Sequence, residues 1–207
     1  MRRFKHIFLI LAVLLVFAPD ARSYQAVIDP DSAPAGTILN NYFAGVTLTA
    51  LGDTGVLSNS NVYSLTETYA TTGTRVFGDT SSSPRYWGNG SYSYLRADFL
   101  GGTTAVWLDF AGNDSSDNNA FLQAYDSSNN LLDSSLYAAN VPPGTFVTLS
   151  VTDPNIAYII ASWDLRERND NGVLDNLRYE KTVPEPTTML LLGLGLVGMA
   201  GLRRFNK

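Results

Sequence analysis

The middle of the chain is a succession of short runs of β-branched and aromatic residues, and this feature most restricts the fold. Between residues 36 and 179 the runs recur about every ten residues, separated by Gly, Asn, Asp, Ser and Pro. No segment there has the 3.6-residue hydrophobic period of a helix. The pattern predicts an all-β domain, a single β-sandwich of the jelly-roll type. The expected strands are 46–51, 62–69, 92–99, 105–110, 120–125, 131–137, 146–151, 156–163 and 173–179.

One of these strands shows which side faces the core. In 105–110 the alternation puts Val106, Leu108 and Phe110 on one face, which we expect to be buried. Trp107 and Asp109 then point the other way.

The N-terminal end has the three parts of a signal peptide. Basic residues at positions 2, 3 and 5 precede an apolar run at 7–18, and small residues follow at Ala21 and Ser23. A permanent N-terminal anchor is the alternative, but a run of this length is short for spanning a bilayer. We therefore expect signal peptidase to remove residues 1–23, cutting after Ser23.

The C-terminal end, 183–207, has an equally definite order of parts. Pro184, Glu185 and Pro186 precede an apolar stretch at 189–202, and Arg203 and Arg204 follow. As a helix this stretch would be roughly 21 Å long, against a hydrocarbon core of about 30 Å. The arginines would hold its end in the cytoplasm, which leaves the preceding domain outside. A plain single-pass anchor is the alternative.

This order of parts resembles the PEP-CTERM sorting signal of Gram-negative bacteria. The resemblance implies an exosortase-type membrane protease as partner, which cuts near the Pro-Glu-Pro tripeptide. It also implies a protein held transiently in the inner membrane and then passed to the cell surface or the exterior. Both prolines disfavour helix, so the tripeptide is expected to be extended and open to a protease.

Residues 24–182 are left as the single mature domain, and their composition excludes several functions. The chain has no cysteine, and its one histidine, His6, lies in the signal peptide. Histidine- or cysteine-based catalytic triads and zinc sites built from these residues are therefore excluded. The domain has 17 acidic and 7 basic side chains, a formal charge of −10. Such an acidic domain is not expected to bind nucleic acid.

Four segments of this domain also form a recognisable series. They are FAGVTL at 43–48, LDFAGND at 108–114, AYDSSNNLL at 124–132 and GVLDNLRY at 172–179. The series resembles a jelly-roll domain that recurs in PEP-CTERM proteins and is similar to galactose-binding-like and carbohydrate-binding modules. This resemblance implies a fold and leaves the ligand open.

Two sets of residues are candidate ligand sites. Asp175 and Asn176 in the last strand, with Asp29 near the first, could hold a structural calcium ion. The alternative is ordinary side-chain hydrogen bonding at a strand end.

Trp87 and Trp163 could stack on sugar rings, together with Tyr86, Tyr92 and Tyr94. The alternative is that these rings are core side chains, which is the commoner fate of tryptophan in an all-β domain.

The leading functional hypothesis is a non-catalytic structural module associated with exopolysaccharide or biofilm. A carbohydrate-binding module proper is the second, and a secreted hydrolase that uses Asp and Glu is the third. Ice binding is a remote fourth, because the Thr-rich segment 66–74 lacks a regular repeat.

Overall fold

The computed structural model describes residues 23–52, 57–79, 87, 93–112, 119–139, 141–163 and 172–182. Nearly all of these belong to one compact unit, Gln25–Lys181. The other unit, of residues 1–24 and 182–207, lies almost wholly outside the described residues, as do Ala21 and the tail residues 183–207. The described part is all-β apart from one 3₁₀ turn, so the predicted fold class is confirmed.

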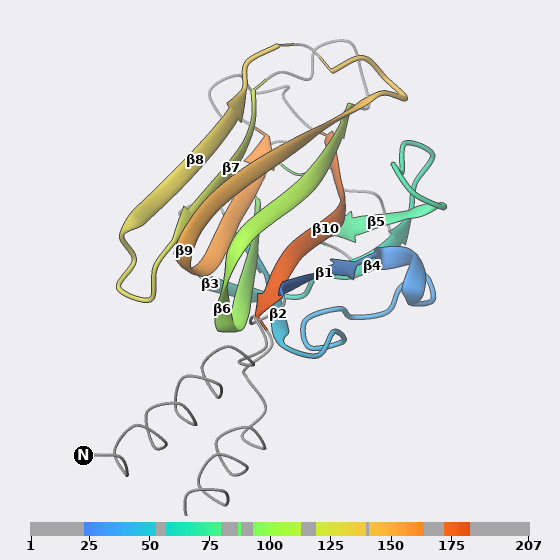
Figure 1. Cartoon of the computed structure of the whole chain (residues 1–207). Helices are drawn as coiled ribbons and strands as arrows, with labels where there is room; N and C mark the ends of the chain where they lie inside the picture. The colour runs from blue at the N-terminus through green and yellow to red at the C-terminus, as the bar shows by residue number, and fades with distance from the viewer. Residues whose placement is uncertain are drawn as a thin grey trace, which may run out of the picture. The chain divides into compact units, whose positions relative to one another are not determined.

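The described residues form ten strands (Figure 1). Their bounds, with the 3₁₀ turn η1, are β1 Ser23–Ile28, η1 Pro30–Ser32, β2 Val46–Leu51, β3 Leu57–Ser60, β4 Tyr63–Thr66, β5 Arg75–Gly78, β6 Tyr94–Gly112, β7 Ala120–Tyr125, β8 Leu131–Tyr137, β9 Phe146–Trp163 and β10 Gly172–Thr182.

Hydrogen bonding joins all ten strands into one continuous sheet. Its main path runs β4-β5-β10-β6-β9-β7-β8, while β1 pairs with β10 and β2 pairs with both β3 and β6. The long strands β6 and β9 are the centre of the fold, because they pair with each other in antiparallel register along most of their length.

Both long strands fold back on themselves near their midpoints (Figure 1). In β6 the bend falls at Gly101 and Gly102, whose φ angles of 86° and 76° suit glycine. The β6–β9 register shifts between Asp98 and Thr103. In β9 the bend is the Asp153 turn, where the Asp153 carboxylate accepts a hydrogen bond from the backbone N–H of Asn155 at 2.8 Å.

The bends turn one sheet into two layers that face each other. We call them the β10 layer (β1, β4, β5, β10, 103–112 and 146–152) and the β7 layer (β2, β3, β7, β8, 94–100 and 156–163). The rings of Phe110 and Trp163 show that the layers are packed together. Phe110 pairs with Val147 and Trp163 with Ala120, in different layers, yet their ring centroids are 5.9 Å apart.

The core lies between the layers and follows the two-residue alternation of the strands. Val106, Leu108 and Phe110 are buried as predicted, and Trp107 is on the opposite face of its strand. Each large apolar side chain buried in this way contributes roughly 2 kcal/mol. Gly172 completes the packing, because any Cβ there would collide with the indole of Trp163.

Candidate functional site

The two tryptophans predicted to stack on glycans are core residues. Both are completely buried. The Trp87 indole N–H donates a 2.7 Å hydrogen bond to the carbonyl of Phe77, and Trp163 packs edge-on against Phe110. A ring that stacks on a sugar needs an exposed face, and neither tryptophan has one. Both are therefore core side chains, which was the alternative. Tyr86 and Tyr92 lie outside the described residues.

The residues predicted to bind calcium have hydrogen-bonding roles instead. The Asp29 carboxylate accepts from the backbone N–H of Asp31 at 2.8 Å and so caps η1. The Asn176 amide donates to Asp109 at 2.9 Å. Among the described residues no three acidic or histidine side chains are grouped closely enough to hold a metal ion.

Asp175 is buried, and its carboxylate is already surrounded by donors. One oxygen accepts from the backbone N–H groups of Thr71 and Thr72, at 2.8 and 3.0 Å, and from the Thr71 hydroxyl at 2.9 Å. The other accepts from the backbone N–H of Asn176 at 2.8 Å. Calcium needs oxygen ligands with free lone pairs, and these donors already engage both Asp175 oxygens. They would compete with a calcium ion for Asp175, and calcium binding stays a prediction.

Burial has the largest effect on the pKa of Asp175. Desolvation raises its pKa to about 6, although the hydrogen bonds from Thr72 and Thr71 act in the opposite direction. Asp109 lies directly opposite on β6 and is also buried. Arg178 offsets that second charge by donating to Asp109 at 2.6 Å, and Thr148 donates to the same oxygen at 2.6 Å.

These contacts fasten a segment over the outer face of the β10 layer. We call residues 67–74 the cover segment. Asp175 binds it at Thr71 and Thr72, while Asp31 accepts from the Thr74 backbone N–H at 3.0 Å. Gly73 makes the second anchor possible, because a Cβ there would overlap the Asp31 carboxylate. The acidic pair beneath is thus a structural anchor, and it is buried.

The outer face of the β7 layer is different, because it carries aromatic rings where an exposed sheet face is expected to be polar. The residues of this aromatic face come from β6, β7 and β9: Tyr94, Arg96, Asp98, Phe121, Tyr125 and Tyr158. The strand registers place them on one side, since their sequence neighbours Leu95, Ala97, Leu122, Ala124 and Ile159 are core residues.

One end of the aromatic face is a layered stack. The rings of Tyr125 and Tyr158 are parallel within 6°, with centroids 5.0 Å apart. The guanidinium of Arg96 lies 3.7 Å from the Tyr158 ring centroid. Arg96 in turn donates hydrogen bonds to Asp98, from Nε at 2.8 and 3.0 Å and from Nη2 at 2.6 Å. The Asp98 hydrogen bond raises the pKa of Arg96, which stays charged.

At the other end Tyr94 and Phe121 approach across β9. Their ring centroids are 6.1 Å apart. Between them on β9 lies Ser162, which pairs with Phe121 and is completely buried. Its small side chain gives the two rings room to meet, and its hydroxyl donates to the Ser93 carbonyl at 2.7 Å.

The turn between β7 and β8 holds the Tyr158 hydroxyl in place. Asp126 accepts from the backbone N–H groups of Ser128 and Asn130, both at 2.8 Å, which shapes the turn between β7 and β8. This turn brings the Asn129 side chain to the Tyr158 hydroxyl, which donates to it at 3.0 Å. Burial raises the pKa of Tyr125 and of Tyr158, so both phenols stay protonated at neutral pH.

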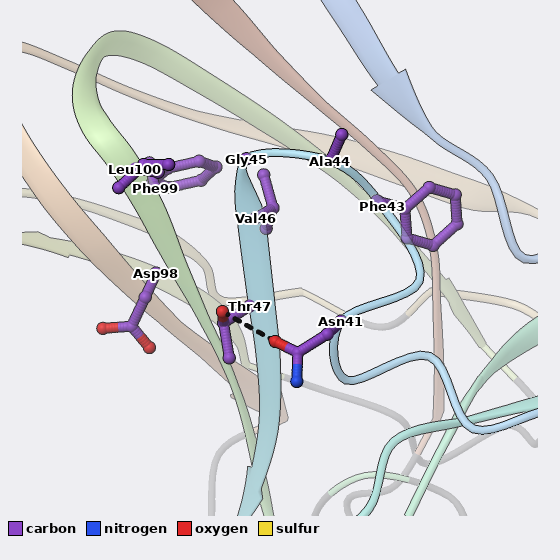
Figure 2. A pocket seen from close by; sticks show the side chains of 9 residues that line it. All are labelled: Asn41, Phe43, Ala44, Gly45, Val46, Thr47, Asp98, Phe99 and Leu100. Atoms are coloured by element: carbon purple, nitrogen blue, oxygen red, sulfur yellow. Dashed lines mark hydrogen bonds between the residues drawn. The ribbon is translucent and has the colours of Figure 1, made fainter.

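A pocket of about 450 Å³ adjoins the Asp98 end of this face (Figure 2). It lies between the start of β2 and the bend of β6, and Thr47 pairs with Asp98 across the two strands. Figure 2 shows Asn41 accepting a hydrogen bond from the Thr47 hydroxyl, which measures 3.1 Å. Leu100 on the pocket rim is 88% exposed. The pocket thus adds two polar side chains, Asn41 and Thr47, within a mostly apolar lining beside the Asp98 end of the aromatic face.

Comparison with known proteins identifies the tail. Residues 182–204 match the model of the PEP-CTERM protein-sorting motif. The chain carries a PEP-CTERM sorting motif. This range includes the Pro184–Pro186 tripeptide and both Arg203 and Arg204, as the sequence predicts, and it marks an exported protein that is sorted at its C-terminus.

Comparison with solved structures concerns the fold of the domain that precedes this motif. The cleaved adhesin domain K2 of Lys-gingipain is 13% identical, with a TM-score of 0.50, over 75% of this chain and 99% of that domain. A family 29 carbohydrate-binding module (CBM29-2) is 10% identical, with a TM-score of 0.39, over 80% and 99%. The C-terminal CBM6 of LamC from Zobellia galactanivorans is 13% identical, with a TM-score of 0.36, over 76% and 100%. The adhesin match shows a shared fold and nothing about function. No curated protein matches the sequence.

The residues of the aromatic face were largely missed by the sequence-based predictions. Only Tyr94 stood among the predicted stacking residues. Tyr125 and Tyr158 are distant in sequence and become neighbours through the β7–β9 register. The available signal was an aromatic or charged residue at every second position within a strand, as in Tyr94, Arg96 and Asp98.

Proposed function

We propose that this PEP-CTERM protein is an exported, non-catalytic module that contacts extracellular polysaccharide through its aromatic face. The supporting observation is that four aromatic rings and a charged pair share one side of the β7 layer, next to a pocket that Asp98 also lines. Sugar rings present apolar faces to aromatic side chains and hydroxyl groups to polar ones. A face that offers both kinds of contact side by side suits a polysaccharide chain.

The polar groups beside the rings match hydroxyl groups in particular. Arg96 uses Nε and Nη2 for Asp98, and no described residue accepts from its Nη1. The amide oxygen of Gln123 accepts from the Tyr125 hydroxyl at 2.8 Å, which directs its amide nitrogen elsewhere. Donors therefore lie beside the Asp98 acceptor, and a hydroxyl group can both donate and accept.

Export and sorting supply the location. In this proposal signal peptidase cuts after Ser23, residues 189–202 hold the protein briefly in the inner membrane, and an exosortase-type protease reads the tripeptide. Among the residues described, no helix is long and apolar enough to cross a membrane, and 189–202 lie outside them. The protein then joins the cell surface or the exopolysaccharide matrix.

A non-catalytic role fits the carboxylates that the structure describes. A glycosidase needs two carboxyl groups that flank the substrate bond. Asp109 and Asp175 lie opposite each other but are buried beneath the cover segment. On the aromatic face, Asp98 is committed to Arg96. The hydrolase alternative would need another accessible pair.

A binding assay tests the proposal. The protein is mixed with insoluble polysaccharides, and the unbound fraction is measured for wild type and for the double variant Phe121→Ala/Tyr125→Ala. We expect the double variant to bind at least about tenfold more weakly, because it loses two stacking rings. The matched control is Trp107→Ala, an aromatic residue on the outer side of the β10 layer, which should bind like wild type.

Thermal unfolding of both variants confirms that they are folded. If no polysaccharide retains the wild-type protein, or if the double variant binds as well as wild type, this face is not a polysaccharide-binding site.

A further inference from the structure

We infer that the aromatic face selects uncharged polysaccharides over polyanionic ones, an inference that rests on the proposed function. Its basis is the pairing of charges on the face. Arg96 is the cation of the face, and Asp98 holds it with bonds as short as 2.6 Å. The pair has no net charge, so a carboxylate or sulfate group gains little from approaching Arg96.

Asp98 also repels an anionic ligand directly. Its side chain is 39% exposed, whereas the Arg96 side chain is 23% exposed. A ligand therefore meets the carboxylate at least as readily as the guanidinium. An ionised carboxylate only accepts hydrogen bonds, so it can bind a sugar hydroxyl but not the oxygens of another anion.

The rest of the domain adds a long-range term of the same sign. Residues 24–182 carry 17 acidic and 7 basic side chains. An acidic domain of this kind lowers the local concentration of polyanions, and the effect weakens as salt shortens the Debye length from about 30 Å at 0.01 M to about 3 Å at 1 M. Uncharged chains are unaffected by this term.

The stacking geometry favours an uncharged chain for a separate reason. Arg96 covers one side of Tyr158 and Tyr125 stacks on the ring, so Tyr158 is buried and the more exposed Tyr125 offers the contact surface. The attraction there is apolar contact with the face of a sugar ring. A ring substituted with carboxylates loses part of that apolar surface.

The experiment compares one glucan with its own carboxymethylated derivative, which has the same backbone but carries added carboxymethyl groups. Full-length protein is kept in a detergent whose headgroup is not a sugar, and affinities are measured at 0.02 M and 0.5 M salt. We expect the parent glucan to bind at least about tenfold more tightly than the derivative at low salt. The ratio of the two affinities should be smaller at high salt.

Two variants locate the effect. Asp98→Asn keeps an acceptor for Arg96 but removes the negative charge, so it should improve binding of the carboxymethyl derivative and narrow the preference. Glu180→Gln removes the same charge from β10 in the other layer, where Glu180 accepts from the Thr104 hydroxyl, and should leave the preference unchanged.

The outcomes separate the two claims. If the carboxymethyl derivative binds as tightly as the parent, or more tightly, the inference of neutral selectivity is wrong and polysaccharide binding stands. An Asp98→Asn variant with unchanged preference also overturns the inference. If neither polymer binds, and no other polysaccharide does, the proposed function fails together with the inference.

Discussion

The buried carboxylate of Asp175 should make the domain less stable as the pH rises through the weakly acidic range. We propose to test this by replacing it with asparagine, Asp175→Asn. The side chain keeps its size, loses its charge and retains one acceptor oxygen for the donors of the cover segment. The informative quantity is the difference in the free energy of unfolding between wild type and variant, followed from pH 3.5 to pH 7.5.

The magnitude follows from the pKa of Asp175. Its ordinary value is 3.8, and in the folded protein it is about 6. Because the folded state binds the proton more tightly than the unfolded state, the stabilisation is complete below pH 3.8 and is lost as the pH rises through 6. A shift of this size corresponds to about 3 kcal/mol. The stability of wild type relative to the variant should therefore fall by that amount across the range.

The assay is urea unfolding at half-unit pH steps, with the slope of the transition checked for constancy. Asp126→Asn is a control of opposite sign. Asp126 is exposed, and the hydrogen bond from the Asn130 side chain lowers its pKa, so its contribution is present above its unfolded pKa and lost as the pH falls.

Refutation of the reasoning is straightforward. If the difference between wild type and Asp175→Asn does not change with pH, or increases, then the hydrogen bonds from Thr71 and Thr72 outweigh the desolvation of the carboxylate.

Three further predictions concern packing, sorting and metal. Gly112→Ala should destabilise the domain by about 1–3 kcal/mol in chemical denaturation, since its Cβ would overlap the Val141 carbonyl oxygen, and a loss below about 0.5 kcal/mol would contradict the packing. Glu185→Ala should make an uncleaved form accumulate, seen by intact mass, while wild type begins after Ser23 and lacks the arginine tail; a wild-type chain that retains Lys207 would favour a plain anchor. Excess calcium should leave the melting temperature equal to that in chelator, because donors occupy the Asp175 oxygens; a rise that Asp175→Asn abolishes would support the calcium hypothesis.

Much of the strand pattern could be predicted from sequence, because alternation directly reports a half-buried strand. The predicted strands at 46–51, 120–125 and 131–137 have the observed bounds of β2, β7 and β8. Two predicted pairs, 92–99 with 105–110 and 146–151 with 156–163, are halves of β6 and β9. The predicted breaks between them are the bends that create the two layers.

The strands β1, β3 and β5 were not predicted, because pairing with neighbours defines them more than their own pattern does. β5, for example, has only four residues and pairs with β4 along its whole length. The candidate site was missed for a related reason. Ring size drew attention to Trp87 and Trp163, but burial of a large ring stabilises the core. The rings of the aromatic face are recognised only once the register of β6, β7 and β9 is known.

In the proposed function the two layers have different roles. On the β10 layer, the acidic pair Asp109 and Asp175 is tolerated because the cover segment supplies N–H and O–H donors, and that same segment covers the outer face. On the β7 layer the outer face carries the stacked tyrosines instead. The consequence is that Asp175→Asn, which should change how stability depends on pH, should leave polysaccharide affinity unchanged at temperatures where the domain stays folded. If that variant weakens binding as much as Phe121→Ala/Tyr125→Ala does, the layers are coupled through the shared strands β6 and β9, and the binding face depends on the anchor behind it.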